Sequence, residues 1–197
     1  MTTSAPTPRY QEKQAWILSV ASRVFARKGY HAASMRDIAR ESDTSLAGLY
    51  YYARSKEELL HAISTQTFDT VIDGARRSVA EGVTAEDRLT RIIENHLAYF
   101  AQHLDEMKVL SQEADSLTGA FGEAIQERKR AYVALVENVL LTMDGDHDRK
   151  VETLALFGMM NWLYTWYRPD EGSIEPIAAT MTRLFLRGYR ATAEADR

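Results

Sequence analysis

The sequence SMRDIARESDTSLAGLYYYARSKEELL, residues 34–60, decides the fold of this chain. Ser34 and Asp37 have the spacing of a capping box, so a helix is predicted to begin here. A polar turn interrupts it, Ser45 is placed to cap a second helix of about two turns, and Ser55 is placed to cap a third. A short helix held behind another is how small domains enter a DNA groove, so the stretch predicts a helix-turn-helix motif.

The charges of the chain divide unevenly at the end of this stretch. Residues 1–60 carry nine Lys and Arg against six Asp and Glu, and the remaining residues carry fifteen against twenty-two. A positive first part beside a negative remainder suggests that only the first part faces phosphate. With 197 residues, 45% of them hydrophobic, the chain is long enough for a small domain and a larger one.

The composition also excludes several kinds of site. The chain has no cysteine, so it has no disulfide, thiolate metal site or thiol nucleophile. Its first residues lack the apolar core of a signal peptide, and Pro6 and Pro8 predict a frayed tail. The longest uncharged stretch, residues 153–167, is shorter than the roughly 20 residues that span a bilayer. We therefore expect a cytoplasmic protein with no membrane partner.

The rest of the chain keeps the helical period. Apolar residues recur at helical spacing, caps and breakers separate the runs, and no strand-like alternation or internal repeat is found. The predicted class is all-α with about nine helices. The first predicted helix covers 11–28, and the helix that Ser55 caps ends near residue 81. Further helices are predicted over 84–103, over 106–116, from Phe121 to just before Asp144, over 147–168 and from Ser173 onward.

The run from Phe25 to Leu60 contains the patterns F-x-x-x-G-Y, S-M-x-D-I-A, S-x-x-x-L-Y-x-Y and S-K-E-E-L-L. These resemble the DNA-binding domain of the tetracycline-repressor (TetR) family. After the tail, predicted to be disordered over 1–9, the resemblance implies a helix-turn-helix domain at 10–56 and a ligand-binding and dimerisation domain at 57–197. It implies a homodimeric transcriptional regulator, a repressor of a metabolic or efflux operon, released from a near-palindromic double-stranded DNA operator by a small-molecule effector.

The candidate DNA contacts lie in and around the second short helix. The first turn of that helix meets base edges in such motifs, and small side chains there allow a close approach. Polar and aromatic neighbours are placed to reach phosphates. The predicted DNA-binding residues are Ser34, Arg36, Thr44, Ser45, Leu46, Ala47, Gly48, Tyr50, Tyr51 and Lys56. The alternative is that Tyr50 and Tyr52 are core residues and that Lys56 and Arg36 are solvated surface.

The chain departs from the family pattern at four places. Asp43-Thr44 stands where such proteins usually have Gly-Val, Ala33 where they have Thr, Ala47 where they have Gly, and Ala53 where they have an aromatic residue. These departures support an alternative function, a helical interaction or adaptor protein that does not bind DNA.

The last two helices are predicted to form the dimer interface. The segment from Leu154 to Tyr167 is apolar on all sides, and the last helix has a long apolar stripe, so each needs a partner on a second side. Two-fold dimers are the commonest assembly, and the resemblance implies the same pairing. The predicted interface residues are Phe157, Trp166, Met181, Leu184, Phe185 and Tyr189. The alternative is that they are the core of the bundle.

A ligand pocket is predicted inside the larger domain. Aromatic and methionine side chains with a few polar atoms suit an apolar small molecule. The candidates are His96, Tyr99, Phe100, His103, Met107, Leu110, Phe121, Arg128, Tyr132, Met159 and Trp162. Packed core with satisfied histidines is the alternative. The basic cluster Arg128-Lys129-Arg130 and a likeness to regulators of fatty-acid or sterol catabolism suggest an acyl-CoA or a hydrophobic acid as the effector; no resident cofactor or metal is predicted.

An enzyme is the least supported class. A di-iron bundle site needs a Glu-x-x-His on each of two helices, and only Glu58 to His61 has that spacing within a helix. Neither a Ser-His-Asp pattern nor a Gly-rich phosphate loop is present. We expect no catalytic residues.

Overall fold

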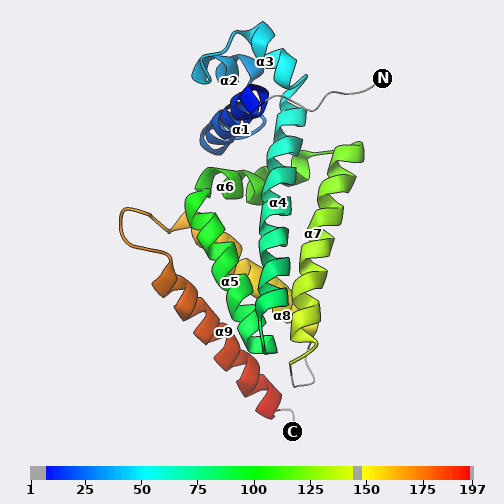
Figure 1. Ribbon diagram of the computed structural model, residues 1–197, viewed down its shortest axis with the longest axis vertical. Helices are drawn as coiled ribbons and strands as arrows, with labels where there is room; N and C mark the ends of the chain where they lie inside the picture. Colours follow the sequence, from blue (N-terminus) through cyan, green and yellow to red (C-terminus); the bar gives the residue numbers. More distant parts are fainter. Residues whose placement is uncertain (1–7, 144–147, 196–197) are drawn as a thin grey trace.

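The chain is all-α, as predicted. The computed structural model describes residues 8–143 and 148–195, with side chains up to residue 189. Within these ranges it forms nine α-helices, two short 3₁₀ helices and no strand (Figure 1). They are α1 (Pro8–Lys28), α2 (Met35–Glu41), α3 (Leu46–Tyr52), α4 (Lys56–Glu81), α5 (Ala85–Gln102), α6 (Leu104–Glu113), η1 (Ala114–Ser116), α7 (Gly119–Leu140), α8 (Arg149–Asn161), η2 (Trp162–Thr165) and α9 (Glu175–Ala195).

The N-terminal unit consists of α1, α2, α3 and the first turns of α4. Short helices such as α2 and α3 are marginal on their own, so their caps and their buried faces hold them. The apolar faces meet in one core, in which Phe25, Ile38 and Leu49 are almost fully buried. Burying each such side chain contributes about 1.5–3 kcal/mol. This core fixes α3 against α2 and leaves one side of α3 exposed.

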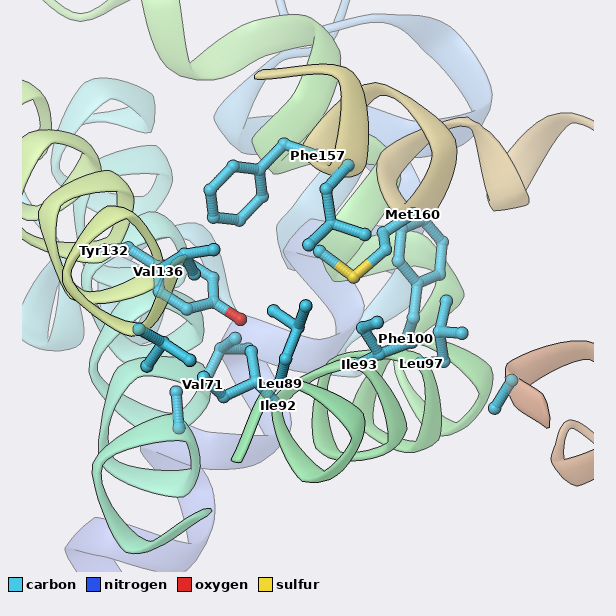
Figure 2. Close-up of a cluster of buried hydrophobic side chains, with 14 of the residues drawn as sticks. Val71, Leu89, Ile92, Ile93, Leu97, Phe100, Tyr132, Val136, Phe157 and Met160 are labelled. Carbon is cyan, nitrogen blue, oxygen red and sulfur yellow. The ribbon is translucent and has the colours of Figure 1, made fainter. Parts of the chain in front are cut away.

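The C-terminal unit is a bundle around α4. Helices α5 and α7 pack against α4, α9 packs along α5, and α8 packs against α7. Figure 1 shows α4 running from the N-terminal unit down between α5 and α7. Helices α4 and α5 approach closely at Gly74, where an added Cβ would lie 2.2 Å from Asn95 Oδ1. Figure 2 shows the apolar centre of this bundle, with Phe157 and Met160 of α8 facing side chains of α5 and α7.

Helices α4 and α6 both join the units. Helix α4 gives Leu59, Leu60 and Ile63 to the N-terminal core, and Val71 and Ile72 to the bundle core. Helix α6 lies between the two units, against α1 on one side and α4 on the other (Figure 1). The predicted boundary at residue 57 falls in the first turn of a helix that both units share, and it stays a prediction.

Several predicted boundaries are wrong by a few residues. Helix α1 begins at Pro8, not at residue 11, because a proline fits the first turn of a helix; the predicted disordered tail 1–9 therefore ends too late, and residues 1–7 lie outside the described chain. The helix predicted over 106–116 is α6 followed by η1. The helix predicted over 147–168 is α8, capped by Asp148, followed by η2; the predicted start at residue 147 lies outside the described residues. None of the described helices is long and apolar enough to cross a membrane.

Candidate DNA-binding surface and ligand pocket

The predicted caps build the helix-turn-helix motif. Ser34 Oγ accepts a hydrogen bond from the backbone N–H of Asp37 at 3.2 Å, and Asp37 Oδ2 accepts one from the N–H of Ser34 at 3.1 Å. Lys28 lies 2.7 Å from the same carboxylate, and this contact above all lowers the pKa of Asp37 below its usual range. Ser45 Oγ accepts from the N–H of Gly48 at 3.0 Å. Both short helices therefore begin where the sequence predicts.

The turn between α2 and α3 is held from α1. The carbonyl of Ser42 accepts hydrogen bonds from Trp16 Nε1 at 3.2 Å and Lys13 Nζ at 3.4 Å. Asp43 has φ of 50°, a left-handed conformation that glycine adopts more easily. The turn keeps its shape without the glycine usual in such motifs because Trp16 and Lys13 hold its carbonyl.

The exposed side of α3 carries several of the predicted DNA contacts. Ser45, Ala47, Tyr50 and Tyr51 are exposed, with Tyr51 73% exposed. Leu46, Gly48 and Thr44 are half-buried, and Ser34 and Arg36 are exposed beside them on α2 and its cap. Tyr50 is thus a surface residue, not core. Tyr52 stacks on Tyr10 of α1, with ring centroids 4.9 Å apart. The DNA contacts predicted for the residues of α2, α3 and the turn between them stay predictions.

Lys56 is engaged within the protein. Its Nζ donates hydrogen bonds to the carbonyls of Tyr30, His31 and Ala33 at 2.9, 3.0 and 3.2 Å, and it lies 4.5 Å from the centre of the Tyr30 ring. An ammonium group has three donors, and this geometry uses all of them. We therefore correct its predicted role: in this structure Lys56 holds the turn after α1 and does not point a free charge at phosphate.

A cavity of about 420 Å³ lies in the bundle. Its size is within the range of small-molecule sites. Of the predicted ligand residues, five line it, and they come from four elements: His96, Met107, Leu110, Tyr132 and Trp162. The other lining residues are Phe68, Val71, Ser111, Ala114, Asp115, Lys129, Val133, Leu154, Phe157, Gly158, Asn161 and Tyr164.

The other six predicted ligand residues do not line this cavity. Phe100 is fully buried in the bundle core, and Tyr99 and His103 stack on each other with centroids 4.2 Å apart. Phe121 stacks on His61 near the N-terminal unit. Arg128 pairs with Asp69 at 2.8 Å. Met159 lines a different hollow, on the outer face of α8 and α9. A helical stripe does not show which part of a helix borders empty space, so the prediction was too broad.

One polar cluster faces the apolar cavity. His96 is 2% exposed, and its Nδ1 lies 3.1 Å from the hydroxyl oxygen of Tyr132. Figure 2 shows the Tyr132 hydroxyl pointing from α7 into the bundle. Burial above all lowers the pKa of His96 to about 4, although the side chain of Asn161 favours the charged form. Burial also raises the pKa of Tyr132. Both rings are therefore neutral near pH 7.

The low pKa of His96 predicts a loss of stability in acid. The unfolded imidazole takes up a proton near pH 6.5 and the folded one near pH 4, so the unfolded chain binds more protons between these values. The free energy of unfolding should fall by about 3 kcal/mol on this account as the pH drops from 6.5 to 4. Urea unfolding of the wild type and of His96→Gln, measured across this range, checks it. Equal pH slopes would contradict the prediction.

A second apolar surface lies on α8, η2 and α9. Its exposed members are Leu154 at 50%, Trp162 at 62%, Trp166 at 46% and Leu184 at 60%. Trp162, Trp166 and Leu184 border a shallow hollow that Gly158, Met159, Ile177 and Met181 also line. Leu154 borders the bundle cavity. We call Leu154, Trp162, Trp166, Met181 and Leu184 the outer apolar face.

Two predicted interface residues point the other way. Phe157 is 8% exposed and packs edge-on against Tyr132, with ring centroids 4.9 Å apart. Tyr189 is 6% exposed, and its hydroxyl donates to the carbonyl of Leu140 at 3.3 Å. Both belong to the inner side of their helices, so their assignment to the dimer interface is wrong. Phe185 is half-buried against the bundle core, between the two sides.

Family models match both units of the chain. Residues 17–63 match the model for bacterial regulatory proteins of the tetR family, and residues 82–189 match the model for the tetracyclin repressor-like C-terminal domain. The second match alone spans more than half of the chain. The chain belongs to the TetR family. That family consists of DNA-binding transcriptional regulators, not enzymes, so the predicted fold and class of function are confirmed.

Individual relatives of this TetR-family chain support the same assignment. A TetR-family regulator from Bordetella parapertussis 12822 is 32% identical, with a TM-score of 0.84 over 92% of this chain and 98% of that one. AibR, solved in complex with isovaleryl coenzyme A and operator DNA, is 27% identical, with a TM-score of 0.77 over 87% of this chain and 97% of that one. The fatty acid metabolism regulator protein of Bacillus subtilis (strain 168) is 23% identical over 68% of this chain and 66% of its own, slightly under two thirds of its length.

The ligand residues predicted from the sequence of this TetR-family regulator did not include several residues that line the cavity. Asn161 is the one amide in the otherwise apolar segment 154–167, which was the available signal for it. Phe68 and Val71 come from α4, on which no ligand residue was predicted. In the basic cluster, Lys129 lines the cavity and Arg128 does not, because one step along a helix turns the side chain by about 100°.

Proposed function

We propose that this TetR-family regulator is a homodimeric repressor that a small apolar molecule releases from a near-palindromic operator. The single observation that supports it most is the apolar cavity of about 420 Å³, because α6 forms one of its walls and also contacts the DNA-binding unit. A cytoplasmic location is part of the proposal, since the protein must reach its operator.

The outer apolar face supports the dimer. Large exposed apolar patches on a soluble protein mark interfaces, and a two-fold axis lets one patch cover its own copy. Gly158 and Gly188 both leave open space where a Cβ would be, which allows the helices of a second copy to approach closely. The proposed interface therefore uses Trp166, Met181 and Leu184, together with Leu154 and Trp162.

The contacts of α6 support a route from ligand to DNA. Met107 and Leu110 face the cavity. On the other side Lys108 Nζ donates to the carbonyl of Ala26 at 2.7 Å, and Glu113 Oε1 accepts from the N–H of Tyr30 at 3.1 Å. A ligand that displaces α6 therefore displaces the end of α1, and a tilt of α4 moves the same unit. Half-sites on one duplex face lie roughly 34–36 Å apart, so a shift of a few Å between the two α3 helices prevents simultaneous docking.

The size of the cavity bears on the acyl-CoA hypothesis. A cavity of about 420 Å³ is at the lower end of the range for small-molecule sites, so we place the acyl chain inside it and the nucleotide outside. The nucleotide would lie at the mouth, where Lys129 is 3.8 Å from Asp115. The AibR complex contains isovaleryl coenzyme A, which makes short acyl-CoA compounds the first panel to test. Calorimetry without heat for the whole panel would reject this effector class.

A gel shift tests the proposed function. The purified protein should retard a fragment from upstream of its own gene and should leave a shuffled fragment of equal length unretarded. Apolar extracts or acyl-CoA compounds should then release the fragment. An adaptor protein would not retard it. A reporter under the same fragment should be transcribed more when the regulator gene is deleted; lower transcription would identify an activator.

A further inference from the structure

His96 borders the cavity, and one of its two ring nitrogens lacks a hydrogen-bond partner among the described residues. It is 2% exposed and borders the cavity, and its Nε2 has no hydrogen-bond partner of normal geometry in the described structure. The side chain of Asn161 approaches the ring but does not complete that bond. Buried polar groups are almost always paired, so an unpaired ring nitrogen at the wall of a cavity indicates that a ligand atom completes it.

The Tyr132 contact decides which nitrogen of His96 carries the proton. The hydroxyl of Tyr132 is on a residue only 4% exposed, and its partner is His96 Nδ1 at 3.1 Å. A buried hydroxyl must donate its proton, and Nδ1 is the acceptor within reach. Nδ1 therefore accepts, and in the neutral ring the hydrogen is on Nε2. The ring thus presents an N–H donor to the cavity.

The surroundings of this donor do not suit an anion. The rings of Phe100 and Phe157 lie 6.1 and 6.3 Å from the His96 ring, and burial keeps His96 uncharged. Among the residues that line the cavity, Lys129 is the one cation, and it is 55% exposed and lies near Asp115. A carboxylate beside His96 would lose its hydration without gaining a charged partner, which costs far more than burying a neutral carbonyl.

We propose that His96 Nε2–H donates a hydrogen bond to the carbonyl oxygen of an uncharged effector, an ester, thioester, amide or ketone whose apolar body fills the cavity. The inference rests on the proposed function only in taking this cavity as the effector site. The inference names a neutral carbonyl as the group that the protein recognises and excludes free carboxylic acids. It assigns His96 the role of selecting carbonyl compounds over acids.

Binding to the free protein tests this. The neutral dye N-phenyl-1-naphthylamine is bound first, and methyl esters from butanoate to dodecanoate are compared with the matching free acids as competitors at pH 7.5. The best ester should displace the dye at a concentration at least tenfold below its acid. In His96→Phe, which keeps a ring but no donor, the ester should lose about tenfold in affinity while the dye binds as before. His96→Gln, which keeps an N–H and an acceptor for Tyr132, should restore most of it.

Each other outcome counts against the inference. Equal binding of ester and acid, an unchanged ester affinity in both variants, or dye binding without displacement by any ester would overturn it. Circular dichroism on His96→Phe and His96→Gln shows that loss of affinity is not loss of folding. Operator release is measured separately. An ester that binds as expected but releases no DNA contradicts the proposed function and leaves the inference standing. A free acid that releases DNA supports the proposed function and contradicts the inference.

Discussion

Leu184→Glu is expected to convert the protein to a monomer and to lower its affinity for operator DNA about 100-fold or more. Leu184 is 60% exposed in the single chain and lies on the outer apolar face with Met181 and Trp166. In the proposed dimer that face is covered by its copy, so the two introduced carboxylates would be buried in the interface without partners. Burying an unpaired charge costs more than such an interface can offset.

The loss of DNA affinity follows from the loss of the second half-site. A dimer on a palindrome binds with two reading heads, and linking two sites raises overall affinity by about 10²–10⁴ over a single site. A monomer keeps the contacts of one α3 helix and the nonspecific phosphate contacts only. Sedimentation gives the mass, and fluorescence anisotropy with the labelled operator gives the affinity.

Ala179→Glu is the matched control. Ala179 is an exposed residue on the same helix, about 140° around it from Leu184. It adds the same charge to α9 outside the outer apolar face, so mass and affinity should stay as in the wild type. If Leu184→Glu remained a dimer with normal operator binding, another surface would form the interface.

The N-terminal unit was predictable because its signals are local. Ser34 with Asp37, and Ser45 with the N–H of Gly48, cap helices within three residues of themselves, and the structure confirms both contacts. Such patterns need no knowledge of the rest of the fold. Lys56 is the exception. Its three acceptors belong to residues more than 20 positions earlier, so nothing near it in the sequence distinguished a structural lysine from a phosphate contact.

The larger unit was predictable in class but not in detail. Apolar period shows that a helix is buried, not what it is buried against. Phe100, Phe157 and Met159 all satisfy the pattern, yet the first lies in the core, the second between cavity and core, and the third on the outer face. The difference depends on how α5, α8 and α9 are rotated against one another, which long-range packing decides.

Helix α6 links the ligand cavity to the DNA-binding unit. The sequence placed the candidate ligand residues Met107 and Leu110 on this helix but gave no sign that it contacts the DNA-binding unit. In the structure one side lines the cavity through Met107 and the other holds α1 through Lys108 and Glu113. Val109 and Ala114 belong to the N-terminal core as well. A helix whose opposite sides serve two sites couples them if it has two positions, and each ligand must favour one of them.

The double variant Lys108→Met with Glu113→Met is expected to bind both DNA and effector. Effector should no longer change its affinity for DNA, and DNA should no longer change its affinity for effector. Both substitutions keep side-chain length while removing the polar contacts of α6 with Ala26 and Tyr30. Coupling between two sites is typically worth about 1–3 kcal/mol, a change of about 5–150-fold in affinity. With the contacts removed, saturating effector should change operator affinity less than about twofold.

The reciprocal measurement makes this test strict. By linkage, operator DNA must weaken effector binding by the same factor as effector weakens DNA binding, so the double variant should lose both effects together. Glu127→Met with Arg130→Met makes the same change of charge at exposed positions of α7 and should keep the wild-type response. If the α6 variant still released the operator normally, the signal would travel through the shared helix α4 instead, and substitutions at the cavity wall of α4, at Phe68 and Val71, would then be the ones to abolish it.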